Sequence, residues 1–183
     1  MEKVRYGIVG FGGIAENRIA KEGFALDRCR FGQKDFPMEL VGVTDLNQKR
    51  RKAADELKVH WFSTYEEMLA SKTVDAVYVA TSNTSHFTVA MAALEAGKHV
   101  LVEKPVTTTV EDAQKLSDYA AEKDLSISVN LMMTKNVYNS KARELIREQA
   151  LGKIDYATLH MEFLYGEDPD EAATWRCARP QAV

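Results

Sequence analysis

The feature that most constrains this chain of 183 residues is a regular alternation of short apolar runs with longer amphipathic segments. The short runs are rich in β-branched residues, as strands buried on both faces are, and the longer segments repeat with a helical period. This alternation is typical of an α/β protein with a doubly wound parallel sheet. Strands are expected at Val4–Val9, Glu39–Thr44, Val74–Ala80, His99–Val102 and Leu125–Val129.

Residues that cap helices indicate where several of the intervening helices begin and end. Ser63 with Glu66 predicts a capping box before the segment YEEMLAS, and Thr109 with Asp112 predicts a looser, acidic version before the next helix. Gly97 suits the left-handed conformation of a helix C-cap, so it is expected to end the alanine-rich helix that precedes the strand HVLVE.

The pattern changes after Asn130. An amphipathic helix is expected to end at Gly152, and a partly alternating strand is expected over Ile154–Leu164. One helix and one strand do not close a hydrophobic core of their own. The chain therefore divides into a nearly complete doubly wound domain, residues 1–130, and the start of an incomplete second α/β domain, residues 131–183.

Composition excludes several classes of partner. Lys and Arg number 24 against 27 Asp and Glu, a net charge of −3 without long basic runs, so neither nucleic acid nor an anionic membrane is an expected partner. Cys29 and Cys177 lie far apart and form no CxxC pair, so we expect neither a disulfide framework nor a metal site. No apolar run approaches the ~18 residues of a membrane span, and the strand pattern begins too early for a signal peptide, so a cytoplasmic protein is expected.

A glycine-rich loop follows the first strand and precedes the helical segment AENRIAKEG. In the Rossmann fingerprint GxGxxA, a glycine such as Gly10 permits the tight turn, one such as Gly12 lets the pyrophosphate approach the backbone, and a small residue such as Ala15 lets helix pack on strand. Methyltransferases carry comparable loops, but an acidic residue usually leads into them, whereas Val9 precedes Gly10 here. The predicted dinucleotide loop comprises Gly10, Phe11, Gly12, Gly13 and Ile14.

Asp45, at the end of the second strand, is the expected partner of the adenosine ribose hydroxyls. It follows Gly10 by 35 residues rather than the usual ~20, which an inserted loop or lengthened helix within Glu22–Met38 explains. A carboxylate there repels a 2′-phosphate and favours NAD. A basic run one turn downstream would admit NADP, or would simply be a solvated helix face; it consists of Lys49, Arg50 and Arg51.

A second motif, ATSNTSHFTVAMAALEAGKHVLVEKP, runs from Ala80 to Pro105. Together with the GxGxxA loop it strongly resembles the Gfo/Idh/MocA family of glucose-fructose oxidoreductases and inositol dehydrogenases, over essentially the whole chain. The resemblance implies an NAD(P)-dependent oxidoreductase that transfers a hydride between nicotinamide and a sugar, cyclitol or related polyol.

Two groups of residues in this motif are expected at the cofactor. Thr81, Ser82 and Asn83 stand at the carboxyl end of a parallel strand, where doubly wound sheets bind their ligands. In the family, the histidine that opens the next helix, here His86, lies near the nicotinamide half of the site, which makes it a candidate catalytic residue. A capping or packing histidine is the alternative for His86.

Lys104 is the main candidate for the chemistry, because hydride transfer to or from a carbinol carbon needs a proton transfer at the oxygen. The resemblance implies that this lysine contacts the substrate hydroxyl and orients the acid/base apparatus. Glu103 is expected to orient Lys104 or to bind the ribose, and the peptide bond before Pro105 is expected to be cis by resemblance.

Three further positions resemble family contacts. Asn130, ending the fifth strand, resembles a residue on the nicotinamide side, and Trp175 with Arg176 resembles a WR pair that reaches back from the second domain; a surface salt bridge is the alternative for Arg176. The family commonly carries an NRRF-like stretch after Asn130, and this chain departs from it, with Lys135 the candidate basic substrate contact. The departing residues are Met132, Met133, Thr134, Lys135 and Asn136.

The resemblance also implies a longer protein, whose C-terminal domain carries a DxGxH-type segment that completes the acid/base apparatus. No such segment occurs between Trp175 and Val183. The chain is therefore expected to be a truncated product or fragment competent for cofactor binding only, and a non-catalytic sensor or regulatory module is the alternative. The unpaired strand after Ile154 predicts a homo-oligomer formed through the second-domain sheet.

Overall fold

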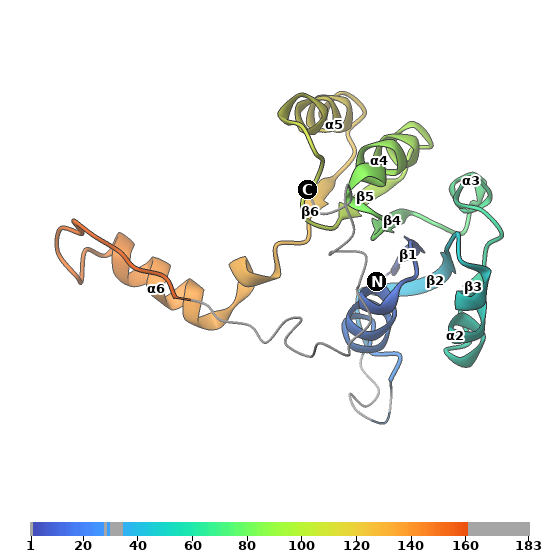
Figure 1. Ribbon diagram of the computed structural model, residues 1–183, viewed down its shortest axis with the longest axis horizontal. Coiled ribbons are helices and arrows are strands. Elements are labelled where there is room, and N and C mark those ends of the chain that lie inside the picture. Colours follow the sequence, from blue (N-terminus) through green and yellow to red (C-terminus); the bar gives the residue numbers. More distant parts are fainter. Residues whose placement is uncertain (1, 28, 30–34, 161–183) are drawn as a thin grey trace, which may run out of the picture. The chain divides into compact units, whose positions relative to one another are not determined.

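The computed structural model describes residues 2–27, 29 and 35–160. The chain forms two compact units, Met1–Asn130 and Leu131–Val183. Each unit is described by itself below (Figure 1).

The first unit contains a six-stranded parallel sheet, as the alternating pattern predicts (Figure 1). Its spatial order is β3-β2-β1-β4-β5-β6, so the order reverses between β1 and β4 and creates a switch point where doubly wound sheets bind ligands. The strands are β1 (Val4–Val9), β2 (Met38–Thr44), β3 (His60–Trp61), β4 (Ala76–Val79), β5 (His99–Val102) and β6 (Ile127–Val129).

Five of these strands were expected, and their bounds agree to within two residues. The sixth, β3, was missed. It consists of two residues, which pair with Gly42 and Val43 of β2. Two residues are too short to show the alternation from which a strand is recognised.

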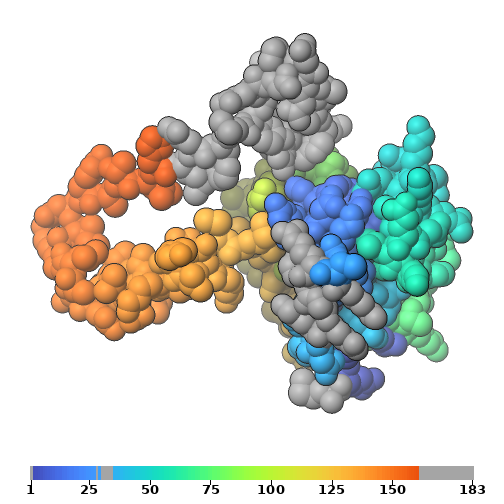
Figure 2. Space-filling view, turned by 90° about the horizontal axis from the view of Figure 1, so that it is seen from below, coloured from blue at the N-terminus to red at the C-terminus, as the bar shows by residue number. Residues whose placement is uncertain are grey.

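Helices cover both faces of the sheet (Figure 1). Successive strand residues point to opposite faces, so Ile8 and Tyr78 pack in one cluster while Val9 and Val79 pack in the other. The Ile8 face holds η1 (Ala15–Gly23) and α2 (Arg51–Glu56), whose segments lie side by side, in blue and cyan, in Figure 2. The Val9 face holds α3 (Tyr65–Ala70), α4 (His86–Glu95) and α5 (Val110–Glu122); single helical turns form η2 (Gln48–Arg50) and η3 (Asn83–Ser85).

The first helix has π-helical hydrogen bonding, with the Phe24 N–H donating to the Ile19 carbonyl five residues earlier at 2.8 Å. It ends at Gly23, and residues 24–27 and 35–37 form neither helix nor strand. The helix after the glycine loop is therefore not extended beyond Gly23, although residue 29 is itself helical. The rest of the extra length before β2 lies partly outside the described residues, so the inserted loop remains a prediction.

The helix caps confirm two expectations and correct one. The Thr109 hydroxyl accepts from the Asp112 N–H at 3.2 Å, and Gly97 has φ +72°, both as expected. The box before α3 is one residue later than predicted: Thr64, not Ser63, caps the helix by accepting from the Glu67 N–H at 3.2 Å. Serine and threonine both cap helices well, and each of these two residues is followed three positions later by a glutamate. The sequence pattern therefore could not decide which of the two is the N-cap.

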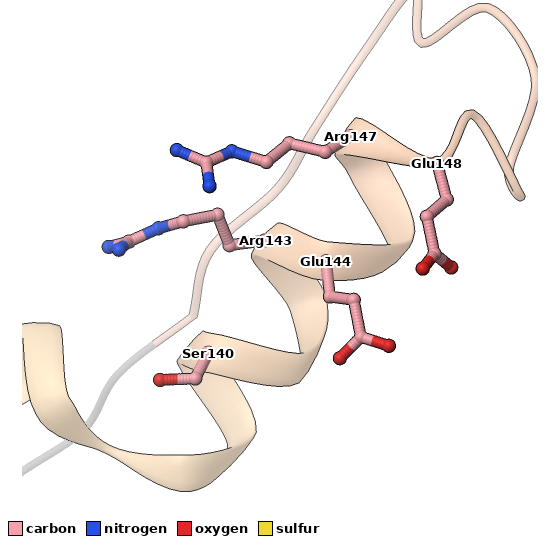
Figure 3. Close-up of a pocket in the computed structure, with 5 residues that line it drawn as sticks. All are labelled: Ser140, Arg143, Glu144, Arg147 and Glu148. Atoms are coloured by element: carbon pink, nitrogen blue, oxygen red, sulfur yellow. The ribbon is translucent and has the colours of Figure 1, made fainter.

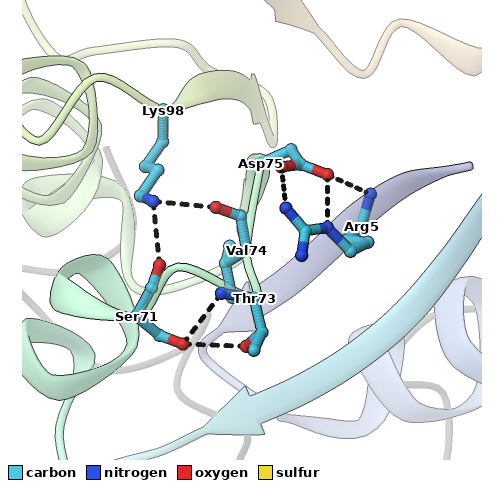
Figure 4. A network of polar contacts seen from close by, with 6 residues as sticks. All are labelled: Arg5, Ser71, Thr73, Val74, Asp75 and Lys98. Carbon is cyan, nitrogen blue, oxygen red and sulfur yellow. Dashed lines mark hydrogen bonds and ion pairs between the residues drawn. The ribbon is translucent and has the colours of Figure 1, made fainter. Parts of the chain in front are cut away.

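The amino end of the sheet is tied by a polar network (Figure 4). Arg5 donates to the Asp75 carboxylate from its backbone N–H at 2.9 Å, from Nε at 2.8 Å and from Nη2 at 2.6 Å. Lys98 donates to the carbonyls of Ser71 and Val74 at 2.9 and 2.8 Å. These bonds join β1 to the entrance of β4 at the edge opposite the expected site.

In the second unit, η4 (Met132–Lys135) precedes α6 (Val137–Arg147), whose N-cap is Asn136. The helix ends at Arg147 rather than at Gly152, because Gln149 already adopts a left-handed φ of +54°. Along α6, the Arg143 and Arg147 side chains point to one side and Glu144 and Glu148 to the other, around a shallow hollow (Figure 3).

The strand expected over Ile154–Leu164 is not formed in its described part. Residues 154–160 have no regular secondary structure. A strand needs a neighbour to satisfy its backbone groups, and within the described residues no second-unit strand is present to pair with it. No helix among the described residues is both long and apolar enough to span a membrane.

Candidate dinucleotide-binding site

The loop between β1 and η1 is anchored to the end of β2. The N–H groups of Gly10 and Phe11 both donate to the Thr44 carbonyl, at 2.9 and 3.2 Å. Gly10 has φ +89°, and a Cβ there would lie 2.6 Å from the carbonyl carbon and oxygen of Ala80. Only glycine tolerates both that dihedral angle and that contact, so Gly10 sets the tight turn.

Gly12 and Gly13 differ from Gly10, because a Cβ at either position would meet no atom within 4 Å. The protein's own packing therefore does not require glycine there. Ala15, at the start of η1, is 1% exposed and packs against the sheet, while Ile14 is exposed. Open space before backbone N–H groups at a helix start is what a pyrophosphate needs, so the loop fits a dinucleotide.

Asp45 follows β2, as predicted, and its carboxylate accepts from the Asn47 N–H at 2.7 Å in a tight turn. Of the basic residues downstream, Lys49 and Arg51 are exposed. Arg50 is not solvated in the same way, because its Nε donates to the Phe11 carbonyl at 2.7 Å and its Nη2 to Glu16.

The end of β4 carries the expected polar residues. Thr81 and Ser82 leave the strand, Asn83 opens η3, and the Ser82 and Ser85 hydroxyls are 2.9 Å apart. His86 begins α4 but points into the interior, where it is 1% exposed. Its Nδ1 lies 2.7 Å from the Pro105 carbonyl and its Nε2 lies 3.2 Å from the Thr81 carbonyl. These contacts join the ends of β4 and β5.

Glu103 is the centre of a network that links β4, β5 and the residue after β6. Its carboxylate accepts from the Tyr78 hydroxyl, and from the Asn130 amide at 2.8 Å; the same Asn130 nitrogen lies 3.0 Å from the Tyr78 oxygen. Its other oxygen accepts from the Lys104 N–H at 3.3 Å. Burial, together with the Glu103 carboxylate, raises the pKa of Tyr78, so the phenol stays protonated and remains a donor.

Tyr78 was missed by the sequence analysis. It lies in the middle of the apolar strand AVYV, where an aromatic residue is expected simply as core, and it is 1% exposed. The available signal was the hydroxyl itself, since a buried tyrosine generally requires a hydrogen-bond partner.

The Lys104 side chain is exposed, and its peptide bond to Pro105 is cis, as the resemblance implies. The residues predicted for the site thus follow β1, β2, β4, β5 and β6, at the carboxyl edge of one sheet. Trp175 and Arg176 lie outside the described residues.

The fold and this edge define a dinucleotide-binding Rossmann domain. The family model described as an oxidoreductase family with an NAD-binding Rossmann fold matches residues 4–131, and the chain belongs to that family. The predicted Gfo/Idh/MocA resemblance is thereby confirmed.

Two of the similar proteins carry the names of enzymes. The chain is 34% identical over 159 residues to D-xylose 1-dehydrogenase (NADP(+)) of Hypocrea jecorina, covering 82% of this chain and 40% of that protein. It is 32% identical over 116 residues to inositol 2-dehydrogenase/D-chiro-inositol 3-dehydrogenase of Halalkalibacterium halodurans, covering 62% of this chain and 31% of the relative.

Solved structures show the same fold. An NAD-binding protein from Listeria innocua matches with a TM-score of 0.72 and 32% identity over 83% of this chain and 42% of that one. KijD10, a 3-ketoreductase from Actinomadura kijaniata in complex with TDP-benzene and NADP, matches with a TM-score of 0.70 and 27% identity, over 80% and 44% of the two chains. The present chain therefore spans less than half the length of these relatives.

Proposed function

We propose that this chain binds NAD(H) at the carboxyl edge of its sheet, as the cofactor domain of an oxidoreductase that acts on a sugar, cyclitol or related polyol. The single observation that carries the proposal is the open space at Gly12 and Gly13 beside the sterically required Gly10. The sugar and cyclitol substrates in the names of the relatives support the substrate class.

The bound cofactor supplies the hydride acceptor or donor. The chain's residues have separate tasks in this proposal. The glycine loop holds the pyrophosphate, Asp45 binds the adenosine ribose, and Asn130 lies towards the nicotinamide side. Asp45 also favours NAD over NADP, because a carboxylate repels a 2′-phosphate.

We propose Lys104 as the catalytic residue that moves a proton at the substrate oxygen, since its side chain is exposed at the same edge. His86 is better suited to positioning than to catalysis. It is 1% exposed, and both ring nitrogens face carbonyls of the chain, so it holds the Pro105 segment that follows Lys104 against the end of β4.

Fluorescence titration of NADH into the 183-residue chain tests the binding proposal. Saturable binding is expected, and its absence would overturn the proposal. A cytoplasmic location and a homo-oligomer both remain predictions.

The Lys104 assignment predicts a separation of binding from turnover. Lys104→Ala should keep the NADH affinity within about twofold of wild type. In a catalytically active form of the protein, the same substitution should lower the turnover rate for oxidation of D-xylose or myo-inositol at least about a hundredfold. The 183-residue chain alone is expected to bind cofactor without sustained turnover, because it spans less than half of its relatives. Equal turnover in the variant would remove the assignment.

A further inference from the structure

Arg50 is attached to the glycine loop. Besides the bond from its Nε to the Phe11 carbonyl at 2.7 Å, its guanidinium carbon lies 5.9 Å from the centre of the buried Phe11 ring. Its side chain is 28% exposed, in contrast to its exposed neighbours Lys49 and Arg51. One of three adjacent cations is therefore withdrawn from solvent.

Glu16 holds Arg50 in that place. It lies in the first turn of η1, its side chain is 15% exposed, and its two oxygens accept from Lys21 Nζ and Arg50 Nη2, each at 2.5 Å. Hydrogen bonds from Lys21 and then from Arg50 lower the pKa of Glu16, so the carboxylate is ionised at neutral pH. An ionised, partly buried carboxylate with two cationic donors is a firm anchor.

We propose that Glu16 is a specificity-determining residue, which binds Arg50 to the glycine loop and thereby withholds its guanidinium from the 2′-phosphate of NADP. The inference rests on the proposed function and deepens its preference for NAD.

The physical reasoning concerns how a 2′-phosphate is recognised. In Rossmann domains an arginine near the end of the second strand accommodates that phosphate, and the planar guanidinium does so through paired hydrogen bonds. Arg50 follows Asp45 by five residues and has the required chemistry. Its Nε donates to Phe11 and its Nη2 to Glu16, so the Nε–Nη2 pair of donors is engaged and the guanidinium is fixed against the glycine loop. With Arg50 held there, the Asp45 carboxylate governs the choice of cofactor.

The experiment compares the dissociation constants of NADPH and NADH by fluorescence titration. Wild type should bind NADH more tightly. Glu16→Gln should lower the ratio of the NADPH constant to the NADH constant by at least about fivefold, because the freed arginine then reaches the phosphate. The double variant Glu16→Gln/Arg50→Gln should return the ratio to the wild-type value.

Glu22→Gln is the matched control. It removes the same charge from the same helix, where Glu22 pairs with Arg18 at 2.9 Å, and it should change the ratio less than about twofold. The inference would be overturned if Glu16→Gln changed the ratio of the two dissociation constants no more than the control does. It would also be overturned if the change in that ratio persisted in the double variant.

Arg50→Gln alone provides an independent test should Glu16→Gln fail to fold. It should leave the ratio unchanged, whereas a rise of about fivefold would show that Arg50 already serves the 2′-phosphate and would overturn the inference. A wild-type preference for NADPH would overturn it as well. A chain that binds neither cofactor contradicts the proposed function itself, whereas binding of NADH and NADPH with an unmoved ratio contradicts only the role of Glu16.

Discussion

Among single residues, Tyr78 joins the core of the sheet to the candidate site. Its ring is buried in the cluster that includes Ile8 and Val43, and its hydroxyl donates to Glu103. Tyr78→Phe keeps the packing but removes a hydrogen bond to a charged acceptor. Asn130 still donates to Glu103, so we expect a loss of ~1–2 kcal/mol in the free energy of unfolding, measured by urea denaturation.

The control for Tyr78→Phe is Tyr156→Phe, because Tyr156 is 85% exposed and its change should leave the free energy of unfolding within ~0.5 kcal/mol of wild type. If the two variants were equally stable, the Glu103 network would not stabilise the fold.

The site residues that sequence reasoning found are those whose chemistry follows from local context. Gly10 and Asp45 could be predicted because each directly follows an apolar run. Glu16, Arg50 and Tyr78 could not be assigned their contacts, because Arg50 and Glu16 are 34 residues apart and Tyr78 and Glu103 are 25 apart. Such pairings become visible only when the sheet order is known.

For the helices and strands, the central part of each element was predictable and its ends were less so. The strands Val4–Val9 and His99–Val102 were placed correctly because helices cover both faces of the sheet, which gives each strand several apolar residues in succession. The two-residue β3 is a strand only because it pairs with β2, which a local pattern does not show. The N-cap of α3 at Thr64 was placed one residue too early because the neighbouring serine is an equally good capping residue. The expected strand over Ile154–Leu164 was wrong in its described part, because a local pattern does not supply a partner strand.

The Arg5–Asp75 pair, which ties β1 to the entrance of β4, predicts a pH dependence of stability. Hydrogen bonds from Arg5 lower the pKa of Asp75 from 3.8 to about 2. A carboxyl group whose pKa is lower in the folded state than in the unfolded state stabilises the fold at pH values above its unfolded pKa. This stabilisation is lost as the pH falls through the pKa of the folded state. Both side chains are 36% exposed, so screening reduces the contribution to ~1 kcal/mol.

Urea denaturation of wild type and Asp75→Asn tests this contribution. The difference in the free energy of unfolding should be constant above about pH 5 and should shrink as the pH approaches about 2. Asp155→Asn is the control, because the pair that Asp155 forms with Lys153 is highly exposed and should contribute little. A difference between wild type and Asp75→Asn that does not depend on pH would contradict the assignment.

For the whole molecule, the main feature is that the amino and carboxyl edges of one sheet carry different groups of polar residues. The amino edge carries the Arg5–Asp75 and Lys98 bonds, while the carboxyl edge carries the glycine loop and the Glu103 network. A change at Asp75 therefore alters the stability of the sheet without removing any residue of the candidate site. The family match to residues 4–131 covers the strands that form both edges.

The most direct measurement of the central claim is a titration of NADH into two alanine variants of the chain. Gly12→Ala places a methyl group where the pyrophosphate is expected, and the protein has no atom within 4 Å of it, so the fold should be retained while the NADH affinity falls at least about tenfold. Gly23→Ala, whose Cβ would meet only the Arg18 carbonyl at 3.5 Å, should bind NADH like wild type. Equal NADH affinities for the two variants would contradict the claim that this loop holds the cofactor.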